Sequence, residues 1–405
     1  MGDYFQNGLV TSLHNLRNRP VEDLESKLVE LSEERPMALI IPSLFSELEG
    51  PALKNIVEEL KEVPYLNEIV IGIDRADKEQ FEYAREFFSV LPQHHRLLWN
   101  DGPRLQELDK RLFEAGIAPR EKGKGRNAWY CFGYVIASGK SEAVALHDAD
   151  ILTYNRSMLA RLFYPVAEPS FNFTFCKGYY FRADEEKLNG RATRLLVTPL
   201  LRTLKKFYSN MDFLDYLDSF RYPLSGEFSM LSDVITNIRI PSDWGLEIGI
   251  LSEVQRNNAF NRICQVDIGD QYDHKHQPVS VDNMEKGLSK MSLDITKAIF
   301  RKLASNGATF NIETIRSIKA TYLRIAEDFI EKYYCDSLLN GYEYDRNKEE
   351  EMVNLFARNL YIAGSYFLQN PMDRDYVPSW KRVLSAFPEF PELFYEAVEK
   401  DNTND

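Results

Sequence analysis

Short runs of consecutive apolar residues alternate along the chain with segments in which apolar residues recur every three or four positions. Met37–Ile41 is a run of the first kind, and such runs make up most of Glu68–Ile73 and Ala143–His147. They are typical of strands buried on both faces. Pro51–Glu62 and Lys78–Val90 are of the second kind and predict helices between these strands. Strands that alternate with helices predict a mostly parallel sheet covered by helices on both faces.

Further segments extend this α/β pattern. The strands predicted in addition are His95–Trp99, Phe171–Arg182 (a strand or a hairpin) and Ile263–Ile268, and the helices are Arg126–Ser138 and Ala192–Ser209.

The pattern changes at both ends of the chain. Leu24 and Leu28 recur at helical spacing, so residues 1–36 are expected to form a helical N-terminal extension. The apolar stripes near the other end are helical throughout, which predicts an all-helical C-terminal region over residues 281–405. The α/β domain is therefore expected to span residues 37–280.

The net charge of −13 argues against polyanionic binding partners. A chain this acidic gains nothing from a nucleic-acid backbone or from an anionic membrane surface, so neither is expected as a partner. The four cysteines are scattered, and the N-terminus lacks a basic region followed by an apolar one, which predicts a cytoplasmic protein with reduced thiols. An anionic substrate would have to be held by a local cluster of Lys and Arg.

Two carboxylates one residue apart follow a predicted buried strand in His147-Asp148-Ala149-Asp150. The carboxyl ends of parallel strands face the ligand crevice of an open sheet, so Asp148 and Asp150 would meet a ligand there. Carboxylate oxygens suit Mg²⁺ or Mn²⁺, which bridge to diphosphate oxygens. The alternative is that both residues only cap the next turn.

Two basic segments could hold anions. Lys122-Gly-Lys-Gly-Arg126 leads into a helix and suits a phosphate, although it could equally be a solvated surface loop. Gly190-Arg191-Ala192-Thr193-Arg194 opens another helix and combines two guanidinium groups, a hydroxyl and helix-terminal N–H groups. Its alternative is ordinary capping, with the arginines on a solvated face.

Two acidic segments and one histidine segment complete the candidate chemistry. Ser225-Gly-Glu227 and Asp243-Trp-Gly-Leu-Glu247 place carboxylates beside small and aromatic residues, which suits sugar hydroxyls. His274 and His276 follow a predicted strand and could supply an imidazole to the same metal, or could be surface residues without a role.

In their order, these motifs resemble those of the glucosyl-3-phosphoglycerate synthases, which are retaining glycosyltransferases of the type-A nucleotide-sugar fold. The resemblance covers roughly residues 37–280, through short motifs and not through continuous similarity. The matching segments are Ile41–Glu47, Gly123–Gly125, Asp148–Asp150, Gly190–Thr193, Ser225–Glu227, Gly245–Gly249 and the loop containing His274.

The resemblance implies transfer of glucose from UDP-glucose to 3-phosphoglycerate with retention, assisted by Mg²⁺ or Mn²⁺. It implies that Asp150 and His274 hold the cation, with His276 as the fallback because this loop is one residue longer. Lys124 would assist at the diphosphate, and Glu227 and Glu247 would position the sugar. The implied donor contacts are Pro42, Ser43, Leu44, Glu47, Lys124, Asp148, Ala149 and Asp150, and the implied acceptor contacts are Gly190, Arg191, Ala192 and Thr193.

One departure from the family leaves alternatives open. Where the family has Pro-Ala-Leu-Asn-Glu-Glu, this chain matches at Pro42 and Leu44 only, and either Glu47 or Glu49 could fill the acidic position. The donor nucleotide and sugar therefore stay open, with GDP-mannose as the alternative donor. Glycerate also stays an alternative acceptor. The alternative from another class is a non-catalytic sugar-nucleotide-binding or scaffold protein, against which the intact Asp-x-Asp argues. A homodimer is the expected assembly.

Overall fold

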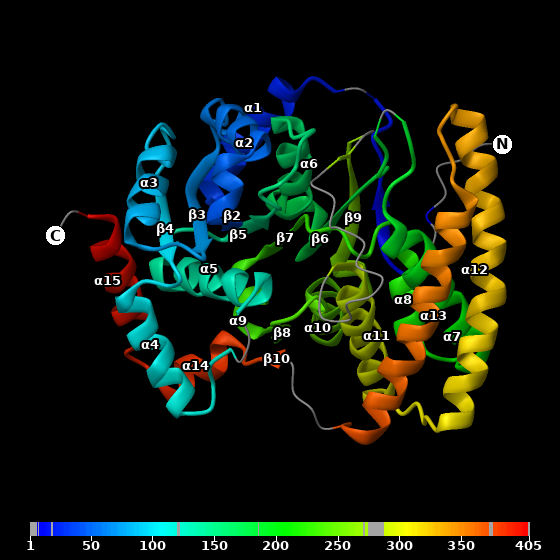
Figure 1. The fold of residues 1–405 in the computed structure, drawn as a ribbon. Coiled ribbons are helices and arrows are strands. Elements are labelled where there is room, and N and C mark those ends of the chain that lie inside the picture. The colour runs from blue at the N-terminus through cyan, green and yellow to red at the C-terminus, as the bar shows by residue number, and fades with distance from the viewer. Residues whose placement is uncertain are drawn as a thin grey trace.

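The chain is organised around one large twisted sheet (Figure 1). The computed structural model describes residues 6, 8–17, 19–119, 122–184, 186–269, 272–273, 287–371 and 376–403. Within these ranges the strands are β1 (Thr11–Leu13), β2 (Met37–Leu44), β3 (Leu66–Asp74), β4 (His95–Trp99), β5 (Ala143–Leu146), β6 (Phe175–Tyr180), β7 (Phe228–Leu231), β8 (Ile240–Pro241), β9 (Ile263–Gly269) and β10 (Tyr376–Val377).

The main sheet has the strand order β1-β9-β6-β7-β5-β2-β3-β4 in the described part of the chain. Strand β7 runs antiparallel to both of its neighbours, β5 and β6, and the other described pairings in this sheet are parallel. A mostly parallel sheet in which each strand is followed by covering helices confirms the predicted α/β class.

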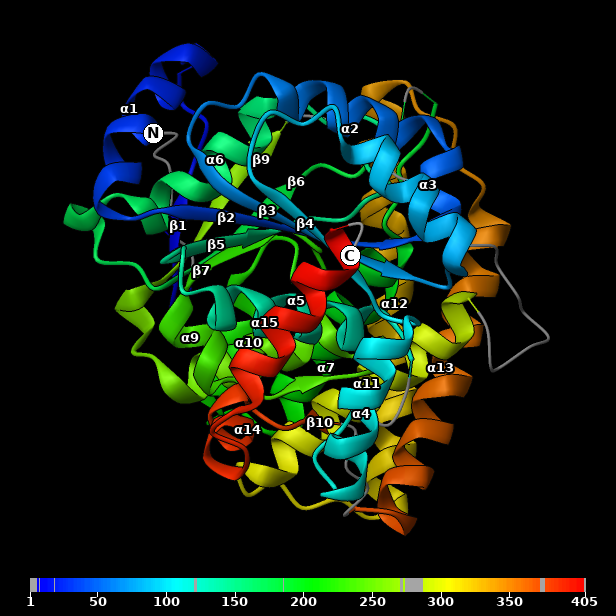
Figure 2. The same cartoon turned by 90° about the vertical axis from the view of Figure 1, so that its left-hand side faces the viewer.

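The side chains of β2 show why its apolar run is unbroken. Met37, Leu39 and Ile41 belong to the core on one face of the sheet, whereas Ala38 and Ile40 belong to the core on the other face. Helices α1, α2, α3 and α6 cover the first face, and α5 with the C-terminal helices covers the second (Figures 1 and 2). A strand buried on both faces has no polar side to expose.

The helices of the described ranges have these bounds: α1 (Val21–Glu34), α2 (Pro51–Lys61), α3 (Lys78–Phe88), α4 (Pro103–Glu114), α5 (Lys124–Ser138), α6 (Arg156–Ala167), α7 (Thr198–Phe207), α8 (Asp212–Ser219), α9 (Ser232–Asn237), α10 (Leu246–Asn257), α11 (Gly287–Ser305), α12 (Ile312–Asn340), α13 (Arg346–Gln369), α14 (Trp380–Ala386) and α15 (Phe390–Asn402).

The N-terminal extension is not purely helical, whereas the C-terminal region is helical as predicted, apart from the two-residue strand β10. Residues 11–13 form β1, which adds a parallel strand to the edge of the main sheet beside β9. Near the other end, β10 pairs antiparallel with β8. The C-terminal helices also share one apolar core with the sheet and with α5, because Trp380 stacks on Trp129 with ring centroids 4.3 Å apart. The expected boundary between residues 280 and 281 lies outside the described residues.

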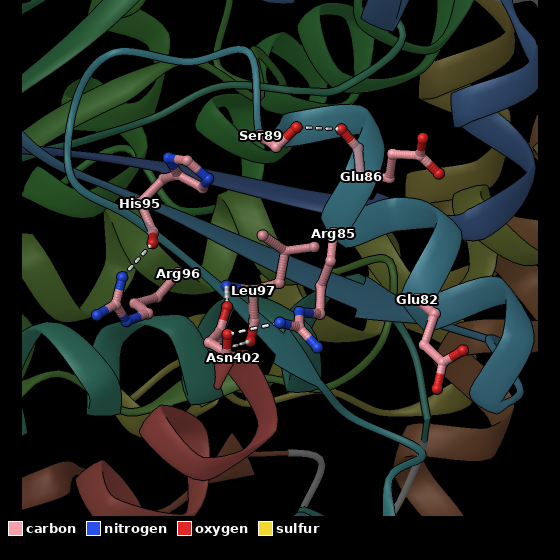
Figure 3. A pocket seen from close by; sticks show the side chains of 8 residues that line it. All are labelled: Glu82, Arg85, Glu86, Ser89, His95, Arg96, Leu97 and Asn402. Carbon is pink, nitrogen blue, oxygen red and sulfur yellow. Dashed lines mark hydrogen bonds between the residues drawn. The ribbon is translucent and has the colours of Figure 1, made fainter. Parts of the chain in front are cut away.

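The last helix, α15, returns to cover the edge strand β4 (Figure 3). The side-chain amide of Asn402 accepts a hydrogen bond from the Leu97 N–H at 2.9 Å and donates one to the Leu97 carbonyl at 2.8 Å. Arg85 of α3 donates to the backbone carbonyl of Asn402 at 2.8 Å. The amide thus replaces a neighbouring strand and satisfies backbone groups that an edge strand would otherwise leave open.

We expect Asn402→Ala to lower the free energy of unfolding by about 1–3 kcal/mol, because both backbone groups of Leu97 lose their partner. The melting temperature should fall by a few degrees. A matched control is Asn340→Ala, which removes an exposed amide contact within α12 and should change stability by less than about 0.5 kcal/mol. Equal melting temperatures for the two variants would contradict this role of Asn402.

Candidate active site

The Asp-x-Asp motif lies where β5 ends, at the carboxyl edge of the sheet. The parallel pairing of β5 with β2 ends at Leu146 and Ile40. Asp148 and Asp150, which come after β5, therefore lie at the same edge of the sheet as Pro42–Leu44, the end of β2. Burial is the main cause that raises the pKa of Asp150, and the negative charge of Glu47, in the short 3₁₀ turn after β2 (Phe45–Glu49), raises this pKa further. The structure therefore brings the predicted donor segment and the Asp-x-Asp motif together.

Lys124 connects two of the predicted motifs. Its ammonium lies 2.5 Å from a carboxylate oxygen of Asp148 and 3.1 Å from one of Glu247. Burial lowers the pKa of Lys124, but the charges of Asp148 and Glu247 outweigh burial and hold the pKa well above its ordinary value. Lys124 is therefore a fixed cation at the Asp-x-Asp motif, as the phosphate-binding interpretation of its loop requires.

Glycines explain how segments distant in sequence meet at this lysine. A Cβ on Gly125 would lie 2.1 Å from the Pro241 carbonyl oxygen, and one on Gly249 would lie 2.2 Å from the Pro241 ring. Only glycine lets the start of α5 and the start of α10 close on the same proline. This close packing places Lys124 on α5 beside Glu247 on α10.

The Ser225-Gly226-Glu227 segment lies directly against the Asp-x-Asp motif. A Cβ on Gly226 would lie 2.4 Å from a carboxylate oxygen of Asp148, so a larger residue there would displace that carboxylate. The Glu227 carboxylate is buried and accepts hydrogen bonds from Tyr272 at 2.5 Å and Ser225 at 3.0 Å. Burial, followed by the charge of Asp148, raises the pKa of Glu227.

The predicted acceptor segment, Gly190–Arg194, is called the acceptor segment below. It begins at Gly190, whose φ of +71° lies in the left-handed region that favours glycine. The N–H groups of Thr193 and Arg194 both donate to the Gly190 carbonyl at 3.0 Å, so they close the turn and do not point at a ligand. The predicted use of these helix-terminal N–H groups for anion binding is therefore wrong for these two residues. A π-helical stretch, Ala192–Val197, follows, as often occurs at functional sites.

The side chains of the acceptor segment are not on a solvated face. Arg191 and Arg194 both pair with the buried carboxylate of Glu349. Thr193 is buried, and its hydroxyl oxygen has no hydrogen-bond partner in the described part of the chain. A hydroxyl and a guanidinium group held in this way remain suitable for an anionic acceptor.

A stack of tyrosines joins the acceptor segment to Glu227. A Cβ on Gly190 would lie 3.2 Å from the Tyr222 hydroxyl, and the Tyr222 ring lies 4.9 Å from that of Tyr180. Tyr180 stacks on Tyr272 at 3.6 Å, and Tyr272 donates to Glu227. The acceptor segment and the Asp-x-Asp motif are thus two ends of one continuous wall.

The chemistry of the Asp-x-Asp motif fits a hard divalent cation. Burial and the neighbouring charge of Asp148 raise the pKa of Asp150 to about 7, because carboxylates crowd at this edge. A cation would relieve this repulsion, and oxygen is the ligand that Mg²⁺ and Mn²⁺ prefer. Among the described residues, no three His, Cys, Asp or Glu side chains group as a metal site. The predicted ligand His274 and its fallback His276 lie outside the described residues.

Two curated proteins are similar to the chain over almost its whole length. The glucosyl-3-phosphoglycerate synthase of Persephonella marina is 45% identical over 405 residues, which is 100% of both chains. The protein of the same name from Methanococcoides burtonii is 41% identical over 403 residues, 98% of each chain. No protein-family model matches the sequence.

The chain belongs to the glucosyl-3-phosphoglycerate synthase family.

Solved structures of more distant proteins share the family's fold. The mannosyl-3-phosphoglycerate synthase of Rubrobacter xylanophilus aligns with a TM-score of 0.55 and 21% identity, over 74% of this chain and 83% of that one. The glucosyl-3-phosphoglycerate synthase of Mycobacterium tuberculosis, in complex with Mn²⁺, UDP-glucose and phosphoglyceric acid, aligns with a TM-score of 0.52 and 18% identity, over 73% and 86%. The predicted type-A fold and the predicted family are both confirmed.

The sequence patterns of the family missed several groups that the structure places in this site. Lys177 is buried in β6, donates to the Ser225 carbonyl at 2.5 Å and lies 5.4 Å from the Phe228 ring. Burial lowers the pKa of Lys177 to about 8. A single lysine within the apolar and aromatic run Phe175–Tyr180 is the signal that could have revealed it. Tyr180, Tyr222 and Tyr272 gave no comparable signal.

Proposed function

We propose that the site around Asp150 and Lys124 performs the reaction that names the family. Glucose passes from UDP-glucose to 3-phosphoglycerate with retention of configuration at the anomeric carbon. The bond from that carbon to the diphosphate breaks, and a bond forms to the hydroxyl of 3-phosphoglycerate, whose proton leaves with the departing diphosphate. The observation that carries the proposal is the contact of Lys124 with both Asp148 and Glu247, which unites three of the matching motifs.

Each group has a task that its surroundings support. Lys124 keeps its positive charge and offsets the charge that develops on the leaving diphosphate. Glu227 and Glu247 accept hydrogen bonds from sugar hydroxyls, since a carboxylate offers about four acceptor positions and protein donors occupy only some of them. Arg191 and Thr193 hold the phosphate of the acceptor.

Asp150 is the described residue best suited to bind the divalent cation. Asp150 would hold the cation, which would act as a Lewis acid and offset the charge of the leaving nucleotide diphosphate. The prediction that His274 is a second ligand stands on sequence alone.

The apparent affinity for Mn²⁺ should fall as the pH drops through about 7. The raised pKa means that Asp150 is charged above pH 7 and protonated below it, so the cation must displace a proton in acid. The groups whose charges act on Asp150 are Asp148, Lys124, Glu47 and Glu227. The concentration of Mn²⁺ giving half-maximal activity should rise by up to about tenfold per pH unit below this point. A constant value between pH 5.5 and 7 would contradict the raised pKa.

A panel of donors and acceptors tests the proposed reaction. UDP-glucose and GDP-mannose are each offered with 3-phosphoglycerate and with glycerate, and the products are identified by NMR, including the configuration at the anomeric carbon. The proposal predicts that UDP-glucose with 3-phosphoglycerate gives the fastest transfer and an α-glucosidic product. Faster transfer from GDP-mannose would overturn the donor, and absence of transfer with every pair would favour a non-catalytic protein.

The compartment and the assembly are the remaining predictions. Cys176 and Cys264 face each other in neighbouring strands and are free thiols, which supports a reducing, cytoplasmic location. None of the helices in the described ranges combines the length and apolar character that crossing a membrane requires. The homodimer stays a prediction that light scattering after size-exclusion chromatography would test.

A further inference from the structure

The helical C-terminal region supplies one buried carboxylate to the acceptor segment. Oε1 of Glu349, on α13, lies 2.6 Å from Nε of Arg191, and Oε2 lies 3.0 Å from Nη1 of Arg194. Glu349 is only 3% exposed. Each carboxylate oxygen therefore holds a different guanidinium group of the same short segment.

Further contacts hold α12, α13 and their connection against the acceptor segment. The backbone N–H of Glu343, in the connection between α12 and α13, donates to the Glu186 carbonyl at 2.8 Å, just before the acceptor segment. The guanidinium of Arg194 donates to the Asn189 carbonyl at 2.8 Å and lies 4.7 Å from the Tyr333 ring of α12. Helices α12 and α13 thus touch the acceptor segment through backbone, charge and aromatic contacts.

Arg191 and Arg194 differ in the exposed fraction of their side chains, which indicates different tasks. The side chain of Arg194 is 9% exposed and is enclosed by the contacts above, whereas that of Arg191 is 30% exposed. Glu349 contacts Arg191 through Nε, which leaves the Nη edge of the guanidinium as the side for a second anion. One carboxylate against two guanidinium groups also leaves a positive charge at the segment.

We propose that Glu349 is a positioning residue for the acceptor: it orients Arg191 so that the Nη edge meets the phosphate of 3-phosphoglycerate. The inference rests on the proposed contact between Arg191 and the acceptor. It makes α13 part of the acceptor site. The rival role is competition, in which Glu349 occupies Arg191 and must be displaced by the incoming phosphate.

Steady-state kinetics of Glu349→Gln separate these roles, because glutamine keeps the shape and removes the charge. Positioning predicts that the KM for 3-phosphoglycerate rises about fivefold or more, while the KM for UDP-glucose stays the same. Competition predicts a fall in the KM for 3-phosphoglycerate, which would overturn the proposal, as would no change.

Glu253→Gln is the matched control. Glu253 is also buried and also pairs with two arginines, Arg239 and Arg256, instead of with the acceptor segment. Its substitution should leave the KM for 3-phosphoglycerate unchanged. A rise equal to that of Glu349→Gln would show a general effect of removing a buried charge and would overturn the proposal.

The double variant Arg191→Ala, Glu349→Gln tests whether Glu349 acts through Arg191. The proposal predicts that Glu349→Gln adds no further increase in the acceptor KM once Arg191 is absent. If Arg191→Ala itself leaves the acceptor KM unchanged, the proposed function of Arg191 fails, and this inference fails with it. If Arg191→Ala raises the KM and Glu349→Gln does not, only the inference fails.

Should Glu349→Gln not fold, Glu349→Asp makes the same test. Aspartate keeps the charge but is one methylene shorter, so it cannot reach both guanidinium groups at their present distances. The acceptor KM should then rise by a smaller factor, and an unchanged value would overturn the proposal.

Discussion

Replacing Asp150 with alanine should abolish nearly all glucosyl transfer while the protein stays folded. The proposed cation would lose a carboxylate ligand at the Asp-x-Asp motif, and the leaving diphosphate would lose the stabilisation that the cation supplies. The expected loss in kcat is on the order of a hundredfold or more, as for the removal of other groups that stabilise charge in a transition state. The measurement is the initial rate at saturating UDP-glucose, 3-phosphoglycerate and Mn²⁺, with circular dichroism to check the fold.

Three further variants complete this test. Asp233→Ala removes an exposed carboxylate from the first turn of α9 and should leave turnover unchanged. His274→Ala should be as damaging as Asp150→Ala, and if His276→Ala is the damaging change instead, the predicted register of that loop is wrong by two residues. Unchanged turnover of Asp150→Ala at saturating Mn²⁺ would rule out Asp150 as the metal ligand.

Arg191→Ala should raise the KM for 3-phosphoglycerate steeply and leave the KM for UDP-glucose nearly unchanged. A charge-assisted contact with a phosphate contributes about 1.5–3 kcal/mol, which corresponds to about a tenfold to hundredfold change. Arg191→Lys should recover only part of this, because an ammonium keeps the charge but lacks the planar fork of the guanidinium.

Glycerate provides the test of specificity, since it lacks the phosphate that Arg191 is proposed to hold. It should be an equally poor acceptor for the wild type and for Arg191→Ala. Arg202→Ala is the matched control, because this arginine is exposed on α7 and pairs with Asp218. An effect of Arg191→Ala on the donor KM alone, or a wild type that prefers glycerate, would refute the acceptor assignment.

The helices and strands that could be predicted from the sequence are those whose burial produces a recognisable pattern of apolar residues within the segment itself. Strand β4 has the predicted bounds, His95–Trp99, and β2 was recognised because burial on both faces makes it uniformly apolar. Strand β2 continues past Pro42 to Leu44. Because β5 pairs with β2 only as far as Ile40, the absent N–H of Pro42 leaves no hydrogen bond to β5 unmade.

Short elements that depend on distant partners could not be predicted in this way. Strand β1 has three residues and exists because it pairs with β9, whose Cys264 is opposite Thr11. Strand β7 has four residues, and β10 has two. Such lengths are too short to show a period, so tertiary contacts decide their structure.

The same distinction applies to the site: residues within local motifs could be predicted, and a residue brought in by tertiary contacts could not. Asp148, Lys124 and Glu227 stand in motifs whose order could be recognised. In the structure Lys124 pairs with Asp148, and Gly226, the neighbour of Glu227, lies against Asp148. Glu349 is separated from Arg191 by 158 residues and lies in a helix without any motif, so nothing local indicates that the two meet. The contact between Glu349 and Arg191 is seen only in the folded chain.

A crystal structure of the protein soaked with UDP-glucose and Mn²⁺ would show directly whether Asp150 binds the cation at the diphosphate. We expect an anomalous signal for Mn²⁺ between the Asp150 carboxylate and the diphosphate, with Lys124 at the diphosphate and the glucose against Glu227 and Glu247. Nucleotide and Mn²⁺ bound at another edge of the sheet, with Asp150 making no contact to either, would contradict the proposed site.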